Sequence, residues 1–183
     1  MSLHSFAPVI GPEARVLILG SMPGGESLRK QQYYAHPRNA FWRIMGTLFG
    51  FPETLPYEER LEWLKRSHVA LWDSLADCER EGSLDSNIHN PEPNDIAGLL
   101  KQNPSIRTVF CNGHASCRFL KKYHAGLFHG NGPEIIQLPS TSPAAALYSF
   151  AEKLDRWTMV REKAGFDAPK GESRQKNGGV GGN

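Results

Sequence analysis

A glycine-rich polar turn follows directly on an apolar segment near the N-terminus. Residues 16–19 are Val-Leu-Ile-Leu, and residues 20–25 are Gly-Ser-Met-Pro-Gly-Gly. Because glycine has no Cβ and proline fixes its own φ, such a turn lets backbone N–H groups approach a ligand closely. A small, flat substrate with polar edges could use these donors. The candidate binding residues of the turn are Gly20, Ser21, Met22, Pro23 and Gly24.

A second polar segment, residues 33–39, leads into an apolar helix. In this segment Tyr34 offers an aromatic face, and Asn39 offers an amide that can direct a water molecule. Asn39 could equally be only the N-cap of the helix, because asparagine is favoured at that position. His36 and the tyrosines could likewise be structural. Local residue types alone leave both interpretations open.

Spacing and composition exclude several other classes of protein. No Gly-Lys-Ser/Thr follows the turn, so it is not a phosphate-binding P-loop, and no serine lies in a Gly-x-Ser-x-Gly context. The three cysteines are too few and too scattered for a disulfide framework or a zinc or iron–sulfur ligand set. The sequence contains no long apolar run and no signal-peptide pattern at its start, so a reduced, cytoplasmic setting is expected.

The overall composition indicates one globular domain. The chain has 183 residues, of which 39% are hydrophobic and 22% charged, and this length allows one sizeable core. The net charge of +2 permits nucleic-acid binding but does not argue for it. We expect residues 1–166 to form this domain and residues 167–183, which are polar and rich in glycine, to be a disordered tail.

Short apolar runs alternate with amphipathic segments along this domain. The patterns predict strands at 15–20, 69–72, 107–111 and 134–138, and helices at 40–49, 56–67, 94–103, 114–123 and 144–163. Asn94 is the expected N-cap of the third helix, and Leu147 is expected on the core side of the last one. Residues 77–93 show no clear period, which predicts a long loop.

The alternation of strands and helices predicts an α/β fold with a four-stranded parallel sheet and helices on both faces. Ligands of such sheets bind beyond the carboxyl ends of the strands. Here those ends carry the 20–25 turn, Asp73-Ser74, Asn112-Gly113 and the 140–143 segment. The site can therefore be located before its chemistry is known. Asp73 and the 140–143 segment could also be ordinary caps of the elements that follow them.

Three segments together resemble the uracil-DNA glycosylase superfamily, from about residue 10 to 160. They are Gly-Ser-Met-Pro-Gly at 20–24, Ala-His-Pro-Arg-Asn-Ala-Phe-Trp at 35–42, and Pro-Ser-Thr-Ser-Pro at 139–143. The second segment is similar to the mismatch-specific branch. The first, together with Trp-Asp-Ser at 72–74 and Gly-Ser-Leu-Asp-Ser-Asn-Ile at 82–88, most resembles the hypoxanthine-DNA glycosylase branch. The resemblance implies a three-layer α/β/α sandwich around the four-stranded sheet.

The resemblance also implies roles for individual residues. Met22 stands where many branches carry a catalytic Asp or Asn, and a thioether cannot orient water, so this role moves to Asn39. Tyr34 matches the aromatic residue that stacks on the flipped base. Candidates to contact the base edge are Asp85, Ser86, Asn87 and Asn112. Candidates to contact DNA are His36, Arg38, Ser140, Thr141, Ser142, Pro143 and Ala144, with Arg118, Lys121 and Lys122 at phosphates.

The function implied by the resemblance is base excision from damaged DNA without a metal or cofactor. A deaminated base, hypoxanthine before others, would be flipped out and its N-glycosidic bond hydrolysed by a monomeric enzyme, leaving an abasic site. The departures at Met22 and at Ser140, where uracil enzymes often carry histidine, disfavour efficient uracil excision. Two alternatives stay open: a uracil or thymine mismatch glycosylase, and a non-catalytic nucleic-acid-binding module of the same fold.

Overall fold

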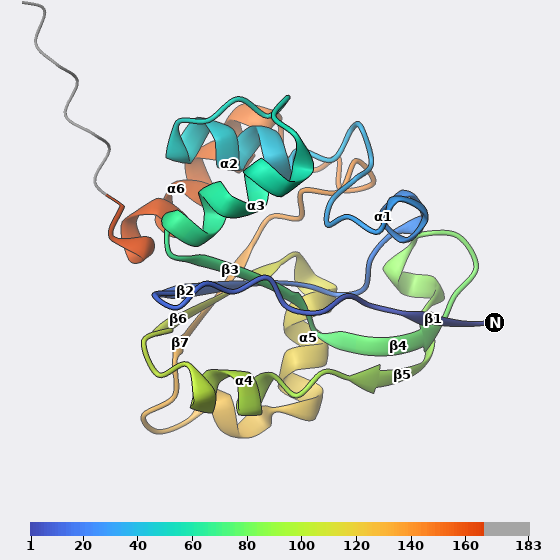
Figure 1. Cartoon of the computed structure of the whole chain (residues 1–183). Helices are drawn as coiled ribbons and strands as arrows, with labels where there is room; N and C mark the ends of the chain where they lie inside the picture. Colours follow the sequence, from blue (N-terminus) through green and yellow to red (C-terminus); the bar gives the residue numbers. More distant parts are fainter. Residues whose placement is uncertain (167–183) are drawn as a thin grey trace, which may run out of the picture.

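The computed structural model describes residues 1–166, and the predicted disordered tail, residues 167–183, lies outside the described residues. Its centre is a four-stranded parallel sheet with strand order β3-β2-β6-β7 (Figure 1). The strands are β2 (Val16–Gly20), β3 (Val69–Asp73), β6 (Thr108–Asn112) and β7 (Glu134–Leu138). All four lie within two residues of their predicted positions. Within residues 1–166, no helix is long and apolar enough to cross a membrane.

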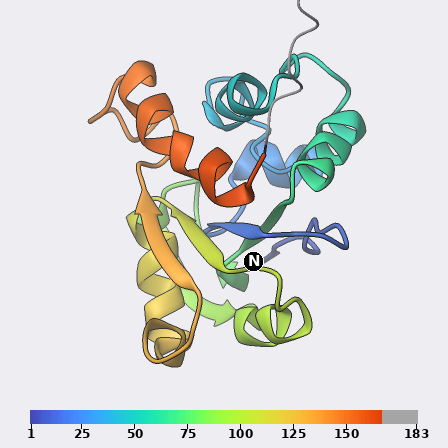
Figure 2. The same cartoon turned by 90° about the vertical axis from the view of Figure 1, so that its left-hand side faces the viewer.

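Helices cover both faces of this sheet, which confirms the three-layer α/β/α sandwich (Figures 1 and 2). One face carries α2 (Phe41–Phe49), α3 (Tyr57–Arg66) and α6 (Phe150–Ala164). The opposite face carries α4 (Ile96–Gln102) and α5 (His114–Tyr123). Three short helices lie in connecting segments: α1 (Gly25–Lys30), η1 (Asp85–Asn87) and η2 (Ala125–Phe128).

Strand β2 lies between two hydrophobic cores, one on each face of the sheet. Val16 and Ile18 pack on the side of α2, α3 and α6, whereas Leu17 and Leu19 pack on the side of α4 and α5. This division follows from the pleat, because successive side chains of a strand point to opposite faces. All five residues of β2 are buried. The apolar run at 16–19 is therefore explained by helices on both of its faces.

The prediction of one long loop at residues 77–93 is wrong. Two strands occupy much of this region, β4 (Leu75–Glu79) and β5 (His89–Pro93), and they pair antiparallel. The N-terminal strand β1 (Ser2–His4) completes a second sheet in the order β1-β4-β5. Because β1 pairs with a segment more than 70 residues away, no local pattern in this polar, proline-containing region could indicate it.

The predicted cap of α4 is displaced by one residue. Asp95, rather than Asn94, is the N-cap, and its Oδ1 accepts a hydrogen bond from Gly98 N at 2.9 Å. Asn94 Nδ2 instead donates to the carbonyl oxygens of Asp73 (2.9 Å) and Leu75 (3.0 Å). Asn94 thus holds the chain where it passes from the parallel sheet into the second sheet.

The last helix begins six residues later than predicted. Ser149 and Glu152 form a reciprocal capping box, which sets the first turn of α6 at Phe150. Residues 139–149 consequently remain a loop. Leu147, predicted to face the core, is 83% exposed on this loop.

Candidate functional site

One pocket of about 320 Å³ lies at the carboxyl ends of the parallel strands. The ends of β2, β3 and β6 contribute to it, together with the segment that carries Asn39 and the loop that follows β7. This is the edge of the sheet at which the strand order predicts a ligand site. The volume falls near the lower end of the ~300–1,000 Å³ typical of small-molecule pockets.

The glycine-rich turn lines the pocket along its whole predicted length, from Gly20 to Gly24. Two side chains from the 80–85 segment hold it in place. Ser21 Oγ donates to Asp85 Oδ1 at 2.5 Å, and Arg80 Nη2 donates to Pro23 O at 2.5 Å. Met22 is almost fully buried in a small cluster that also contains Leu75, Cys78 and Phe119. Met22 therefore has a packing role, in accord with its inability to orient water.

Asn39 lines the pocket and also supports the helix that follows it. Its Oδ1 accepts a hydrogen bond from Phe41 N at 2.9 Å, although Ala40 occupies the N-cap position itself. The two interpretations of Asn39 are thus compatible, because the contact that orients the first turn of α2 also orients the amide. The neighbouring His36 lines the pocket as well, whereas Arg38 is exposed outside the lining.

Tyr34 is held in an unusual backbone conformation beside the pocket. Its φ is +55°, in the left-handed region that non-glycine residues seldom adopt. The ring stacks on Phe41 with centroids 3.9 Å apart, and the buried Oη atom has no hydrogen-bond partner. Burial and the nearby carboxyl of Asp73 raise the pKa of the Tyr34 phenol, and the side chain of Asn112 opposes this rise. Backbone strain of this kind is concentrated at functional sites.

The loop after β7 is tied to the pocket by a reciprocal pair of hydrogen bonds. Asn112 Nδ2 donates to Thr141 Oγ1, and Asn112 Oδ1 accepts from Thr141 N, both at 2.9 Å. Ala40 N donates to Thr141 O at 3.0 Å, which connects this loop to the Asn39 segment. Residues 140–144 all line the pocket. Asn112 also lines it, but its side chain is engaged in positioning the loop.

The other predicted base contacts, Asp85, Ser86 and Asn87, form η1, and only one of them reaches the pocket. Asp85 lines the pocket, whereas Ser86 and Asn87 are exposed and lie outside the lining. Asn87 Nδ2 donates to Glu81 O at 3.3 Å, within its own segment. Three adjacent residues were predicted together, but consecutive residues of a short helix point in different directions.

Sequence reasoning placed Asp73 at the predicted edge of the sheet but gave it no chemical role; the residue ends β3 and lines the pocket. The residue is 3% exposed, and its Oδ2 is buried without a hydrogen-bond partner. Burial raises the pKa of this carboxyl to about 7, the negative charge of Asp85 adds to the rise, and Arg80 opposes it. The sequence signal that could have singled out Asp73 is a carboxylate at the end of an otherwise apolar strand. In the structure this residue pairs with Gly20 in the parallel register.

The raised pKa makes folding stability depend on pH. The folded state keeps a proton on Asp73 up to about pH 7, whereas an unfolded chain releases it near the ordinary value of 3.8. Stability must therefore fall as pH rises through this window. We expect Asp73→Asn to be more stable than the native protein at pH ~8, by a margin that shrinks by a few kcal/mol at pH ~4. Denaturant unfolding at both pH values measures this difference; an equal margin at both would contradict it.

Comparison with known proteins gives the family. Residues 7–161 match the family model described as the uracil DNA glycosylase superfamily. The chain belongs to the uracil DNA glycosylase superfamily. The residues that match the superfamily model include every segment that lines the pocket.

Individual relatives agree with the superfamily assignment. The chain is 39% identical over 161 residues to a hypoxanthine DNA glycosylase of Methanosarcina acetivorans, covering 87% of this chain and 98% of the relative. It is 42% identical over 117 residues to a hypoxanthine DNA glycosylase of Methanosarcina barkeri, covering 63% and 74%. The solution NMR structure of a candidate uracil DNA glycosylase from M. acetivorans superposes with a TM-score of 0.77 at 35% identity, covering 91% of this chain and all of the other.

Proposed function

We propose that this protein is a monofunctional DNA glycosylase that excises hypoxanthine and leaves an abasic site. The observation that carries the proposal is the convergence of Asn39, Tyr34 and the 20–24 turn around one pocket of about 320 Å³. The names of the two Methanosarcina relatives support the choice of base. The proposal includes one catalytic domain, residues 1–166, that acts as a monomer in the cytoplasm on damaged DNA.

The reaction begins with extrusion of the nucleotide, because the glycosidic bond cannot be attacked inside a duplex. Stacking on Tyr34 would offset part of the unstacking cost by ~1–3 kcal/mol. As the base leaves, the sugar gains positive charge, as in other glycoside cleavages. The amide of Asn39 cannot accept a proton at neutral pH, but it can align a water molecule and direct its carbonyl dipole toward that charge. Backbone N–H groups of the 20–24 turn would stabilise negative charge on the departing base.

The rim of the pocket carries features suited to a bent or opened duplex. Apart from the first residue, the large hydrophobic side chains that are exposed within residues 1–166 are Leu84 (53%) and Leu147 (83%). Leu84 lines the pocket, and Leu147 lies on the loop whose first residues, 140–144, line it. Apolar side chains of this kind can insert between base steps when a nucleotide is displaced. His36, Arg38 and residues 140–144 would contact the surrounding DNA.

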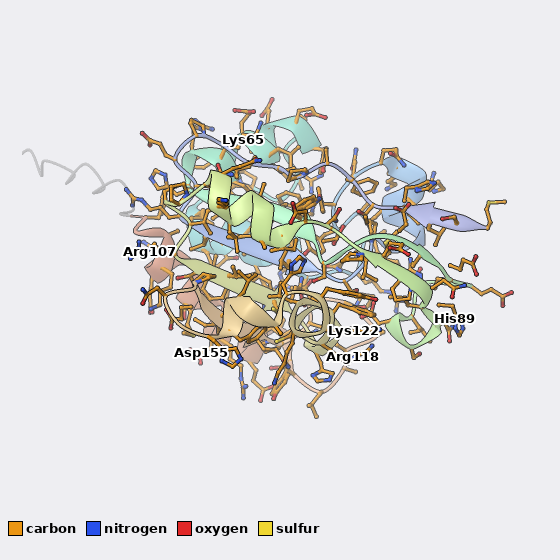
Figure 3. All side chains as sticks on the ribbon, turned by 90° about the horizontal axis from the view of Figure 1, so that it is seen from below. Lys65, His89, Arg107, Arg118, Lys122 and Asp155 are labelled. Carbon is orange, nitrogen blue, oxygen red and sulfur yellow. The ribbon has the colours of Figure 1, made fainter. Side chains whose placement is uncertain are left out.

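Helix α5 begins two residues after the pocket residue Asn112 and carries positive charge. Arg118 and Lys122 are one helical turn apart and lie close together on one side of the molecule (Figure 3). With His114, Cys117 and Lys121 they line a second, shallow hollow. Side chains of this type bind phosphates without reading sequence. We propose that these residues contact the DNA backbone.

The exposed Leu147 gives a direct test of DNA contact. We expect Leu147→Ala to lower single-turnover hypoxanthine release by ~5- to ~50-fold, because the displaced base would no longer be replaced in the stack. Leu147→Met, which keeps an apolar side chain of similar length, should retain most of the activity. Equal loss in both variants, or no loss in the alanine variant, would contradict insertion of Leu147.

The experiment that tests the whole proposal compares labelled duplexes with one hypoxanthine, uracil, xanthine or mismatched thymine. Under single-turnover conditions, alkali reveals the abasic sites. Preferential cleavage at hypoxanthine supports the proposal, and preferential cleavage at uracil or thymine supports a mismatch glycosylase. Met22, which is buried and cannot orient water, stands where many branches carry a catalytic residue, and this keeps a non-catalytic module as the second candidate. Binding to the hypoxanthine duplex with no abasic product would favour that module.

A further inference from the structure

The glycine-rich turn at residues 20–25 cannot fix its own shape. Three of its six residues are glycines, which have more conformational freedom than any other residue type. In the proposed function, backbone N–H groups of this turn stabilise negative charge on the departing base. Such stabilisation is effective only when the donors are already in place before the reaction. The turn must therefore take its shape from contacts with other segments.

Two hydrogen bonds hold the ends of this turn. Near its start, Ser21 Oγ donates to Asp85 Oδ1 at 2.5 Å, and at its end Gly25 N donates to Ser83 Oγ at 2.9 Å. Both partners of the turn belong to the 80–85 segment, which follows β4. The peptide group in the middle of the turn needs a further contact if its direction is to be fixed.

Arg80 supplies this contact in the middle of the turn. Its guanidinium donates through Nη2 to Pro23 O at 2.5 Å and through Nε to Gly82 O at 3.0 Å. The planar fork of an arginine can hold two carbonyl oxygens in a fixed arrangement, whereas lysine offers a single rotating ammonium group. Arg80 is half-buried and lies outside the pocket lining, so it reaches the Pro23 carbonyl from outside the pocket.

The contact with Arg80 sets the direction of the Gly24 N–H. Residues 1–166 contain no cis peptide bond, and in a trans peptide the C=O and the N–H point in opposite directions. Because the Pro23 carbonyl points toward Arg80, the Gly24 N–H points the other way, to the pocket side. Gly24 lines the pocket and is partly exposed, and its N–H has no acceptor within residues 1–166. A ligand in the pocket can therefore reach this donor.

We propose that Arg80 is a positioning residue that aims the Gly24 N–H at the departing base. This inference rests on the proposed function. As the glycosidic bond breaks, its electron pair stays with the base, and negative charge grows on the ring. The Gly24 N–H then makes a stronger hydrogen bond in the transition state than in the ground state, which raises the rate of the chemical step. Arg80 acts only through the peptide group that joins Pro23 to Gly24.

The positive charge of Arg80 offers a different route to the site. Burial and Asp85 raise the pKa of Asp73, and Arg80 opposes this rise. The two routes differ in their dependence on Gly24. An effect of charge would persist in a protein that lacks the Gly24 N–H, whereas an effect of positioning would disappear there.

Gly24 permits a substitution that removes the donor alone. Its φ of −72° is close to the value of about −65° that a proline ring imposes, so Gly24→Pro deletes the N–H and keeps the path of the backbone. Gly24→Ala is the matched control, because it keeps the N–H, and its Cβ would lie at an ordinary contact distance of 3.6 Å from Ser83 Oγ. Arg29→Ala is the control for Arg80, because Arg29 is exposed on α1 and lies outside the pocket lining.

Each variant is measured in two assays. The first is single-turnover release of hypoxanthine. The second is binding to a duplex with 2′-fluoro-deoxyinosine, which resists cleavage because fluorine destabilises the cationic sugar. We expect Arg80→Ala and Gly24→Pro each to slow release by ~10- to ~50-fold. This is less than the ~10²–10³-fold cost of losing a donor from an enclosed oxyanion hole, because water can partly replace the donor at the partly exposed Gly24.

Binding of the fluorinated duplex should change by less than ~3-fold in both variants, since the donor acts mainly in the transition state. The double variant should be no slower than the slower single variant, because both changes remove the same donor. Arg80→Lys, which keeps the charge and is less disruptive to folding, should also be slowed, whereas Gly24→Ala and Arg29→Ala should match the native protein.

Several outcomes would overturn the inference: unchanged release in Arg80→Ala or Gly24→Pro, additive losses in the double variant, full activity in Arg80→Lys, or a loss of binding as large as the loss of rate. If Arg80→Ala does not fold, Arg80→Lys and the comparison of Gly24→Pro with Gly24→Ala decide the matter. Absence of release by the native protein would overturn the proposed function together with the inference. Release by the native protein with unchanged variants would overturn the inference alone.

Discussion

Replacing Asn39 by alanine should lower the single-turnover rate of hypoxanthine release by ~10²-fold or more. Asn39 lines the pocket, and its Oδ1 accepts a hydrogen bond from Phe41 N, so its amide is held in one orientation. In the proposed mechanism, an amide positioned in this way aligns water and faces the developing positive charge without reorganising during the reaction. Replacing the Asn39 amide by a methyl group should leave base flipping and stacking on Tyr34 intact but remove the alignment of the attacking water. Single-turnover experiments, with enzyme in excess over duplex, isolate this step from product release.

The Asn39 variant also loses a contact that supports helix α2. Loss of a capping acceptor costs ~0.5–2 kcal/mol, so the assay must be run well below the melting temperature of the variant. Asn131→Ala, at an exposed residue outside the pocket, is the matched control and should keep full activity. Full hypoxanthine release by a folded Asn39→Ala protein would move the catalytic role to another residue. A loss explained entirely by unfolding would show up as a shifted melting curve.

Gly20→Ala should reduce both activity and stability, although it adds only one methyl group. The new Cβ would lie 2.5 Å from Asp73 Oδ1, a side chain that is buried and cannot move into solvent. Overpacking of this kind costs ~1–3 kcal/mol of folding free energy. The floor of the pocket is formed by the buried residues Gly20 and Asp73, which both line it. Displacing this floor should slow hypoxanthine release by ~10- to ~10²-fold, since small misplacements near a reacting group have large effects. Denaturant unfolding and single-turnover cleavage measure the two effects separately.

Gly126→Ala is the appropriate comparison for this variant. Gly126 lies in η2, and a Cβ there would meet nothing within 4 Å. We expect this control to match the native protein in both assays. If Gly20→Ala also matched it, Asp73 and Tyr34 would have to relax freely, and the floor would not be the rigid surface that the hydrogen bonds around Asp73 indicate.

Much of the parallel sheet and its site could be predicted because the signals are local. A run such as residues 16–19 must be covered on both faces, and the chain direction then brings the ends of β2, β3 and β6 to one edge. The glycine-rich turn, Asn39, Tyr34 and the 140–144 segment followed from this edge and from the resemblance to a family. Their residue types and spacing are visible without any coordinates.

Other features depend on partners far away in the sequence. The second sheet forms because residues 2–4 pair with residues 77–79, and neither segment has an apolar pattern of its own that requires the other. The start of α6 depends on the competition between a capping box at Ser149 and the alanine-rich segment before it. Leu147 lies outside the core as a consequence, since the loop ends where the cap begins.

The sequence alone determined the α/β class, the edge of the sheet at which the pocket lies, and the residues of the turn and of the Asn39 segment that line it. These properties follow from hydrophobic period, chain direction and residue type, all of which are local or topological. Only the tertiary structure identified Asp73 as the floor of the pocket. Its protonation depends on desolvation and on Asp85 and Arg80, which the second sheet and η1 bring near it. Burial and electrostatic environment are properties of the packed chain, and no short sequence pattern encodes them.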